Sequence, residues 1–188
     1  MSELLATIAV KAPKSPPPWA KPLIFLDMDG VLNSNAFFTS TPPPPEDCAS
    51  REMFLAMIDP AAVAHLRWLL DRSRADVVLS SSWRCAMDPT EVASMLRERG
   101  LGADWLGFVG ETPTPKAMRD AGESIDPGGR RGREIDCWLR RNNAHDRLFV
   151  ILDDDSDMEP LMHRLVQTKY DTGLQREHVE RALEMLAR

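Results

Sequence analysis

Short apolar runs alternate along the chain with longer segments that repeat apolar residues at helical spacing. Continuous apolar runs of three to five residues are typical of parallel strands, which are covered on both faces. The predicted strands are residues 23–26, 77–79, 105–109, 148–152 and 165–168. Because strands alternate with helices, the sequence predicts an α/β fold, a doubly wound and mostly parallel sheet flanked by helices.

Helix-start signals and apolar spacing place the helices between these strands. Asp59-Pro60 opens one helix. The segment Asp88-Pro89-Thr90-Glu91 opens another with an N-cap, a proline at N1 and an acid at N3, and this helix ends near Gly100. Two later helices are marked by Ile135, Trp138 and Leu139 and by Val179, Leu183 and Leu186. Residues 110–129 are rich in proline and glycine and are expected to form a loop.

Proline-rich segments divide the chain into a tail and one domain. Residues 1–21 contain KAPKSPPPW and are expected to be a flexible tail, because proline lacks the amide donor that helices and central strands require. Residues 22–188 are expected to form one domain, which is long enough for a substantial core. Within it, residues 33–58 contain Pro42 to Pro45 and are expected to form a loop.

Charge and cysteine content exclude several classes of function. The formal net charge is -6, which argues against a broad surface for duplex DNA or membranes but leaves room for a local basic pocket. No apolar run is long enough to span a bilayer, and no secretion signal is present. Cys48, Cys85 and Cys137 are widely spaced and form no CxxC pair. This pattern favours a reducing, cytoplasmic compartment and argues against a zinc site.

Polar clusters follow three of the predicted strands. They are Asp27 with Asp29, residues 80–84, and residues 153–157. Ligands bind at the carboxyl ends of parallel strands, which meet at one edge of the sheet. We therefore expect the three clusters to converge there and to form the functional site. Trp83, within the second cluster, is expected to be a core side chain.

The first cluster predicts a metal ion. Asp27 and Asp29 would point to the same side if the strand continued, and Gly30 allows a sharp turn after them. Like charges at close range raise a pKa strongly or require a cation. Carboxylate oxygens suit Mg²⁺, which keeps several waters and takes only a few carboxylates. The metal would in turn hold an anionic substrate, for which a phosphate is the natural choice.

Four motifs resemble those of the haloacid dehalogenase (HAD) superfamily of phosphohydrolases. DMDGV resembles the first motif and LSSSWR the second, Arg131-Gly132 stands where the third has a basic residue, and ILDDDSD resembles the fourth. The segments SSSWR, RGREIDCWL and VILDDDSDM are most similar to one branch, the HAD domain of "Swiss Army Knife" RNA-repair proteins. The resemblance covers about residues 23–186. It implies a HAD-like fold with a small or absent cap, because residues 33–58 are too short and proline-rich for a large one.

The resemblance implies a Mg²⁺-dependent phosphatase of phosphate monoesters. Asp27 would attack phosphorus and form an aspartyl-phosphate, and Asp29 would protonate the leaving oxygen and then activate water. Mg²⁺ would be held by the Asp27 carboxylate, the Asp29 backbone carbonyl and an acid of the fourth motif. Asp154 is the first choice for this acid and Asp153 the second.

Hydroxyl and guanidinium groups would bind the phosphoryl group. Ser81 would donate a hydrogen bond to it, although three consecutive serines leave Ser80 as an alternative. Arg131 would offset charge on the transferring oxygens, in a position where the family usually has lysine. Arg84 would clamp a second substrate group, because a guanidinium matches phosphate oxygens bidentately.

Several functions remain open at this point. The resemblance implies an RNA or DNA end or a nucleotide as substrate, and a small phosphorylated metabolite is the alternative. A non-catalytic phospho-acceptor or binding module, like a receiver domain, is a hypothesis from another class. The spacing of Asp27 and Asp29 favours the enzyme, because the second carboxylate supplies the acid/base group that a receiver lacks. A third hypothesis keeps the fold without activity. The sequence specifies no oligomeric state.

Overall fold

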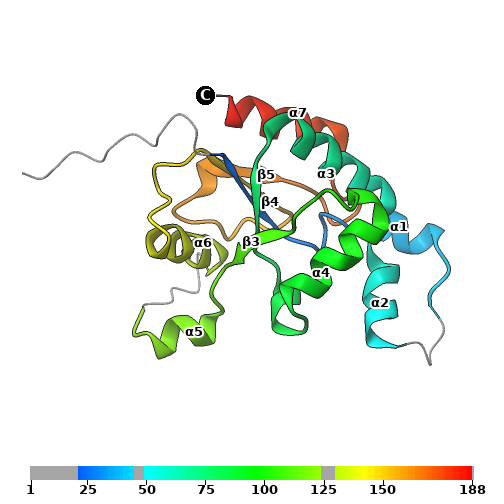
Figure 1. The fold of residues 1–188 in the computed structure, drawn as a ribbon, viewed down its shortest axis with the longest axis horizontal. Helices are drawn as coiled ribbons and strands as arrows, with labels where there is room; N and C mark the ends of the chain where they lie inside the picture. The colour runs from blue at the N-terminus through cyan, green and yellow to red at the C-terminus, as the bar shows by residue number, and fades with distance from the viewer. Residues whose placement is uncertain (1–20, 45–48, 124–129, 188) are drawn as a thin grey trace, which may run out of the picture.

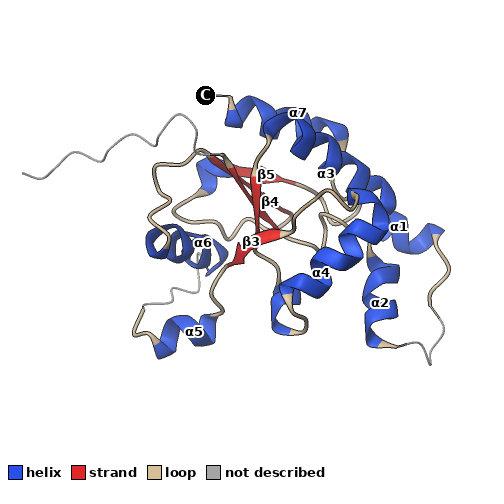
Figure 2. Ribbon diagram, in the orientation of Figure 1, coloured by secondary structure: helices blue, strands red, loops and turns tan. Residues whose placement is uncertain are grey.

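The computed structural model describes residues 21–44, 49–123 and 130–187. In these residues a five-stranded, all-parallel sheet carries helices on both faces, which confirms the predicted α/β, doubly wound fold (Figures 1 and 2). The predicted N-terminal tail lies outside the described residues except for Lys21.

The order of the strands creates a switch point in the middle of the sheet. The strands are β1 (Leu23–Leu26), β2 (Asp76–Leu79), β3 (Phe108–Glu111), β4 (Phe149–Asp153) and β5 (Leu165–Gln167), and their order across the sheet is β3-β2-β1-β4-β5. The chain moves from β1 outward to β3 and then returns to add β4 on the other side of β1. In sheets of this kind ligands bind where the direction reverses, here outside the carboxyl ends of β1 and β4.

The third strand begins later than the sequence predicts. Residues 105–109 were expected to form it, whereas β3 runs from Phe108 to Glu111. Gly107 has a φ of +103°, which is incompatible with a strand at that point. Trp105 instead packs its ring edge against Phe108, with the ring centroids 5.2 Å apart. Packing of the preceding loop therefore explains Trp105, one of the apolar residues that suggested an earlier strand.

The four longest predicted helices are present. They are α3 (Pro60–Ser73), α4 (Pro89–Leu96), α6 (Arg130–Arg141) and α7 (Arg176–Leu186). The side chains of Asp59 and Asp88 accept hydrogen bonds from the backbone N–H groups of Ala61 and Thr90, as expected of N-caps. Beyond α4 the chain continues as a π-turn, Arg97–Leu101, in which Gly100 has a φ of +121°.

Shorter helices occupy segments that were predicted to be loops. Within residues 33–58 the structure contains α1 (Asn35–Ser40) and α2 (Ser50–Met57), and within residues 110–129 it contains α5 (Pro115–Asp120). The prediction of plain loops was wrong here. Ser34 caps α1, and Thr114 caps α5 with Pro115 in its first turn, but neighbouring prolines and glycines obscured these starts. In residues 27–44 and 49–59, which the structure describes, the segment between β1 and α3 forms no large cap.

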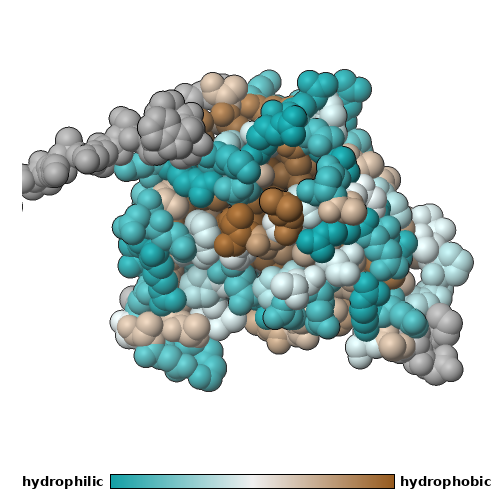
Figure 3. All heavy atoms as spheres, viewed as in Figure 1, coloured by the Kyte–Doolittle hydropathy of each residue, from teal (hydrophilic) through white to brown (hydrophobic). Residues whose placement is uncertain are grey.

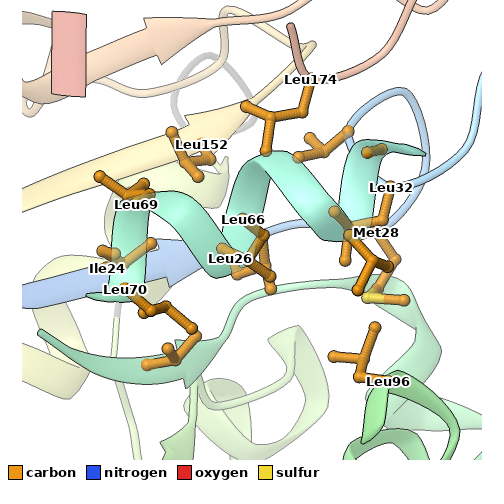
Figure 4. Packing of buried hydrophobic residues seen from close by; sticks show 14 of the residues in the cluster. Ile24, Leu26, Met28, Leu32, Leu66, Leu69, Leu70, Leu96, Leu152 and Leu174 are labelled. Atoms are coloured by element: carbon orange, nitrogen blue, oxygen red, sulfur yellow. The ribbon is translucent and has the colours of Figure 1, made fainter. Parts of the chain in front are cut away.

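Alternate residues of β1 belong to cores on opposite faces of the sheet. Ile24 and Leu26 pack with α3, α4 and α7, and Figure 4 shows them beside Leu66 and Leu69 of α3. The opposite core contains Leu23, Phe25 and the α6 residues Ile135, Trp138 and Leu139. Because β1 is completely buried, its last residue holds the following aspartate at a fixed position.

In the described part of the chain, no single helix has both the length and the apolar character needed to cross a membrane. Helices α2 and α3 pass that test only as a pair bent by 70° at the break between them.

Candidate active site

The three polar clusters lie together at the carboxyl edge of the sheet. Asp27 directly follows β1, and Asp153 is the last residue of β4, the strand beside it. The backbone N–H of Ser80 donates to the carbonyl of Leu26 at 2.8 Å, which places the cluster after β2 at the same level. The structure therefore brings these segments to the switch point of the sheet.

Three carboxylates face one another at this point. Asp27, Asp153 and Asp154 can each offer an oxygen such that all three atoms lie within 4.8 Å. Asp27 is 6% exposed and Asp153 is 1% exposed. Burial raises the pKa of Asp27 to about 6, with Arg131 opposing this rise. Burial and the nearby charge of Asp27 raise the pKa of Asp153 to about 8. Such a group favours a cation among its oxygens.

The donor set fits a magnesium ion. Oδ1 of Asp27 and Oδ2 of Asp153 are buried and accept no hydrogen bond from the described residues. Buried polar atoms are nearly always paired, which makes the orphaned oxygen of Asp27 an indication of a missing partner, while Oδ2 of Asp153 has Nε of Arg131 3.5 Å away. Mg²⁺ prefers carboxylate oxygen and takes few protein ligands. Asp27, Asp153 and Asp154 could therefore hold it, and the carboxylate of Asp29 lies outside this group.

Gly30 leaves the space that Asp154 occupies. Its φ is +65°, and a Cβ at this position would lie 2.3 Å from Cγ of Asp154. The turn is fixed because the amide of Gly30 donates to Oδ1 of Asn33 at 2.9 Å and the hydroxyl of Thr168 donates to its carbonyl at 2.7 Å. A side chain at residue 30 would consequently displace the Asp154 carboxylate rather than the backbone.

We expect the substitution Gly30→Ala to weaken Mg²⁺ binding by about 10- to 100-fold, as is usual when the support of a metal ligand is lost. Calorimetric titration with Mg²⁺ would measure this. Gly122→Ala is the matched control, because Gly122 also has a positive φ, +74°, but nothing within 4 Å of an added Cβ. Equal Mg²⁺ affinity in the two variants would contradict a role for Asp154 in metal binding.

Asp29 is held apart from the three carboxylates. The strand ends at Leu26 instead of continuing, and Asp29 lies in the turn that follows. The indole Nε1 of Trp83 donates to both carboxylate oxygens of Asp29 at 3.1 Å, and Nδ2 of Asn33 donates to Oδ1 at 2.8 Å. Asp27 and Asp29 therefore have different environments, which is the arrangement expected when two carboxylates perform different tasks.

Trp83 is a core side chain that also contacts the site. It is 3% exposed, as predicted for a core residue, and its ring packs against Phe54 of α2 with the centroids 4.8 Å apart. Sequence analysis missed its hydrogen bond to Asp29. A buried indole N–H usually requires an acceptor, and this requirement is the signal that could have revealed the contact.

Of the two candidate serines, Ser81 lies beside Asp27. Its hydroxyl forms a hydrogen bond that lowers the pKa of Asp27, and it accepts one from the backbone N–H of Trp83 at 3.3 Å. The hydroxyl of Ser80 is buried and has no partner among the described residues. Successive side chains at a strand end diverge, and the geometry therefore favours Ser81 as the phosphate-binding serine.

Arg131 supplies positive charge to the carboxylates. Its Nε lies 3.5 Å from Oδ2 of Asp153, and its backbone N–H donates to Oδ2 of Asp157 at 3.2 Å. Burial lowers the pKa of Arg131, but the charges of Asp27 and Asp153 outweigh this and raise it. A Cβ on Gly132 would lie 2.3 Å from the backbone of Met158. The first turn of α6 thus packs closely on the loop after β4, which brings Arg131 into the site.

Protein groups already engage the side chain of Arg84. Its side chain is only 2% exposed, and its Nη2 donates to Oε2 of Glu134 at 2.7 Å. Its Nη1 donates to the carbonyl of Ser81. Because these protein groups engage the guanidinium, its placement gives no support to the prediction that Arg84 clamps a second substrate group. Glu134, which the sequence analysis did not single out, lies at the centre of this arrangement.

A separate cavity of about 380 Å³ opens at the other end of the sheet. It is lined by Lys21, Asp76 and Val77, which stand at the amino ends of β1 and β2. Leu106 and Val109 also line it and are 92% and 53% exposed. In the view of Figure 3, hydrophobic atoms lie in the middle of the molecule, at the place that β3 occupies in Figure 1. The cavity is not part of the candidate active site.

Comparison with known proteins gives one match. The family model described as "HAD domain in Swiss Army Knife RNA repair proteins" matches residues 23–179. This range extends from β1 into α7 and includes every residue of the candidate active site. None of the curated proteins matches the chain.

Proposed function

The chain belongs to this family of HAD domains, and we propose that it is a Mg²⁺-dependent phosphatase that hydrolyses phosphate monoesters through an aspartyl-phosphate. Membership in the family by itself indicates a phosphohydrolase. The observation that carries the finer proposal is the buried, unpartnered oxygen of Asp27 beside Asp153 and Asp154, with Asp29 held separately. One carboxylate is thereby available as a nucleophile and another as an acid.

Asp27 and Asp29 perform different steps of the proposed reaction. The Asp27 carboxylate attacks phosphorus, and the proton that the leaving oxygen requires comes from Asp29, which Trp83 and Asn33 hold in place. Asp29 then takes a proton from the water that hydrolyses the aspartyl-phosphate. When bound, Mg²⁺ neutralises the carboxylates and the phosphate oxygens.

Ser81 and Arg131 would bind the phosphoryl group during this reaction. The hydroxyl of Ser81 lies beside Asp27 and can donate a hydrogen bond to a phosphoryl oxygen. The guanidinium of Arg131 already lies 3.5 Å from Asp153, where it can offset negative charge that develops on the equatorial oxygens.

As substrate we propose a nucleic-acid end or a nucleotide. Two features support this choice. One is the RNA-repair context in the description of the family, and the other is that the described residues between β1 and α3 contain no element larger than the six- and eight-residue helices α1 and α2. The net charge of -6 argues against broad electrostatic binding of a duplex. Recognition would therefore concentrate on the terminal phosphate. The cysteine pattern leads us to propose a cytoplasmic location.

Phosphate release in the presence of Mg²⁺ tests the proposal. The panel consists of an aryl phosphate, nucleotides, and RNA and DNA oligomers with 3′- or 5′-phosphates. We expect release from all monoesters and the highest kcat/KM with an oligomer. Release from small substrates alone would favour a metabolite phosphatase. A stable phosphoryl group on Asp27 without turnover would favour a phospho-acceptor module. The absence of both turnover and a phosphoryl group would favour an inactive fold.

A further inference from the structure

Glu134 is a buried carboxylate that the proposed reaction does not use. It lies on α6 and is 1% exposed. Its Oε2 accepts hydrogen bonds from Nη2 of Arg84 at 2.7 Å and from Nη1 of Arg131 at 3.2 Å. Arg130 lies 3.5 Å from its other oxygen. A buried charge is costly unless it is paired, and the partners of Glu134 come from two different elements at the edge of the site.

Glu134 and the site hold the Arg131 guanidinium from two sides. Nη1 of Arg131 reaches Glu134, and Nε faces Oδ2 of Asp153 at 3.5 Å. The planar guanidinium offers donors on different nitrogens to the two acceptors in a fixed geometry, whereas the ammonium of lysine concentrates its donors on one atom at the end of a flexible stem. This geometry accounts for an arginine at a position where lysine is usual in the family.

The same carboxylate fixes the turn that carries Ser81. Arg84 follows β2, and its side chain donates both to Glu134 and to the backbone carbonyl of Ser81. The side chain of Arg84 is 2% exposed, as is that of Glu134. A chain of contacts therefore runs from Ser81 through Arg84 and Glu134 to Arg131.

We propose that Glu134 is a positioning residue that aims Arg131 at the transferring phosphoryl group and anchors Arg84 against the Ser81 turn. This inference rests on the proposed phosphatase function. Glu134 acts through the two arginines and does not touch the substrate. If Glu134 had a purely structural role, it would only neutralise the buried arginines. The structural role and the positioning role therefore differ in their expected effect on kcat.

The substitution Glu134→Gln tests the proposal, because glutamine keeps the shape and one acceptor but removes the charge. We expect kcat to fall by about 10- to 100-fold with a much smaller change in KM, since the alignment of Arg131 matters most in the transition state. Glu180→Gln is the matched control, as Glu180 also pairs with an arginine, Arg176, but lies on α7 away from the site. It should retain wild-type kinetics.

A double-mutant cycle with Arg131→Lys separates positioning from structure. If Glu134 acts through Arg131, Glu134→Gln should reduce kcat by less than about threefold once Arg131 is already lysine. Multiplication of the two separate losses would overturn the proposal, as would wild-type kcat in Glu134→Gln.

Two further experiments test the proposal if Glu134→Gln does not fold or if the wild-type protein shows no turnover. If Glu134→Gln fails to fold because Arg84 loses its countercharge, the same cycle can be run in an Arg84→Met background, where no guanidinium is stranded. A crystal structure of Glu134→Gln decides the matter independently of turnover. We expect the Arg131 guanidinium to move away from Asp153, and an unchanged position would overturn the proposal even if the wild-type protein releases no phosphate. Absence of wild-type turnover would by itself count only against the proposed phosphatase.

Discussion

The substitution Asp27→Asn is expected to lower kcat for phosphate release by about 10⁴-fold or more, as loss of a catalytic nucleophile typically does. The amide of asparagine cannot form the aspartyl-phosphate, and it also removes one carboxylate from the proposed metal site. Single-turnover and steady-state phosphate release would measure the loss. Retention of a tenth of wild-type kcat in this variant would rule out Asp27 as the nucleophile.

The same substitution is expected to stabilise the metal-free protein. Burial raises the pKa of Asp27 from its ordinary value of 3.8 to about 6. At pH 7.5 the carboxylate is ionised in both states but is less well stabilised in the folded one. An uncharged amide relieves this penalty, and the free energy of unfolding in EDTA should rise by on the order of 1–3 kcal/mol.

Asp29→Asn is the matched control for the stability measurement. Asp29 is half-exposed, and its oxygens accept hydrogen bonds from Trp83 and Asn33. This variant should therefore lose turnover without gaining stability. Because Asp27 remains intact in it, a phosphoryl group trapped on Asp27 should be detectable by mass spectrometry with a reactive aryl phosphate. Gain of stability in Asp29→Asn but not in Asp27→Asn would contradict the assigned environments.

Local patterns were sufficient to predict the sheet and the edge at which the polar clusters meet. The fully apolar run 23–26 requires other elements to pack on both of its faces. The N-caps Asp59 and Asp88 accept hydrogen bonds from backbone N–H groups only two residues away, so a short stretch of sequence reveals them. Parallel strands then force the segments after β1, β2 and β4 to meet. By contrast, the late start of β3 depends on the positive φ of Gly107 and on where the Trp105 ring packs, which no short-range pattern specifies.

The contacts that organise the site could not be predicted in the same way. Trp83 and Glu134 are joined to Asp29 and Arg131 by hydrogen bonds that depend on which side chains meet across different elements. Sequence patterns identified Arg84 as a phosphate ligand because of its charge. In the structure its guanidinium pairs with Glu134, fifty positions later in the chain. Residue type thus indicated the chemistry of the site, whereas tertiary packing determined which arginine faces it.

The stability of the metal-free protein is expected to fall as the pH rises from 5 to 8, and Mg²⁺ is expected to reverse this trend. Asp27 and Asp153 have ordinary pKa values of 3.8, which the fold raises to about 6 and about 8. Between the unfolded and folded values, the folded state binds more protons than the unfolded state. Stability consequently declines with pH by up to about 1.4 kcal/mol per pH unit for each group.

Asp153, whose pKa lies at about 8, is expected to dominate this decline between pH 7 and 8, which makes that interval the most informative one. Asp27 has already titrated there, and His178, whose pKa burial lowers from 6.5, acts with the opposite sign only at lower pH. Denaturant unfolding in EDTA would measure the slope, and Asp153→Asn should flatten it. An unchanged slope in that variant would show that another group is responsible.

Magnesium would bind the ionised carboxylates, and its effect on stability should therefore grow with pH. At a concentration 100 times its Kd the ion stabilises a protein by about 2.7 kcal/mol, and this gain should be large at pH 8 and small at pH 5, where protons compete for the same oxygens. Asp154→Asn should diminish it. Over the same range, EDTA should reduce phosphate release to the level of Asp27→Asn. A Mg²⁺-induced stabilisation equal at pH 5 and pH 8 would mean that the ion binds elsewhere, because no other three carboxylates in the described part of the chain approach one another as Asp27, Asp153 and Asp154 do.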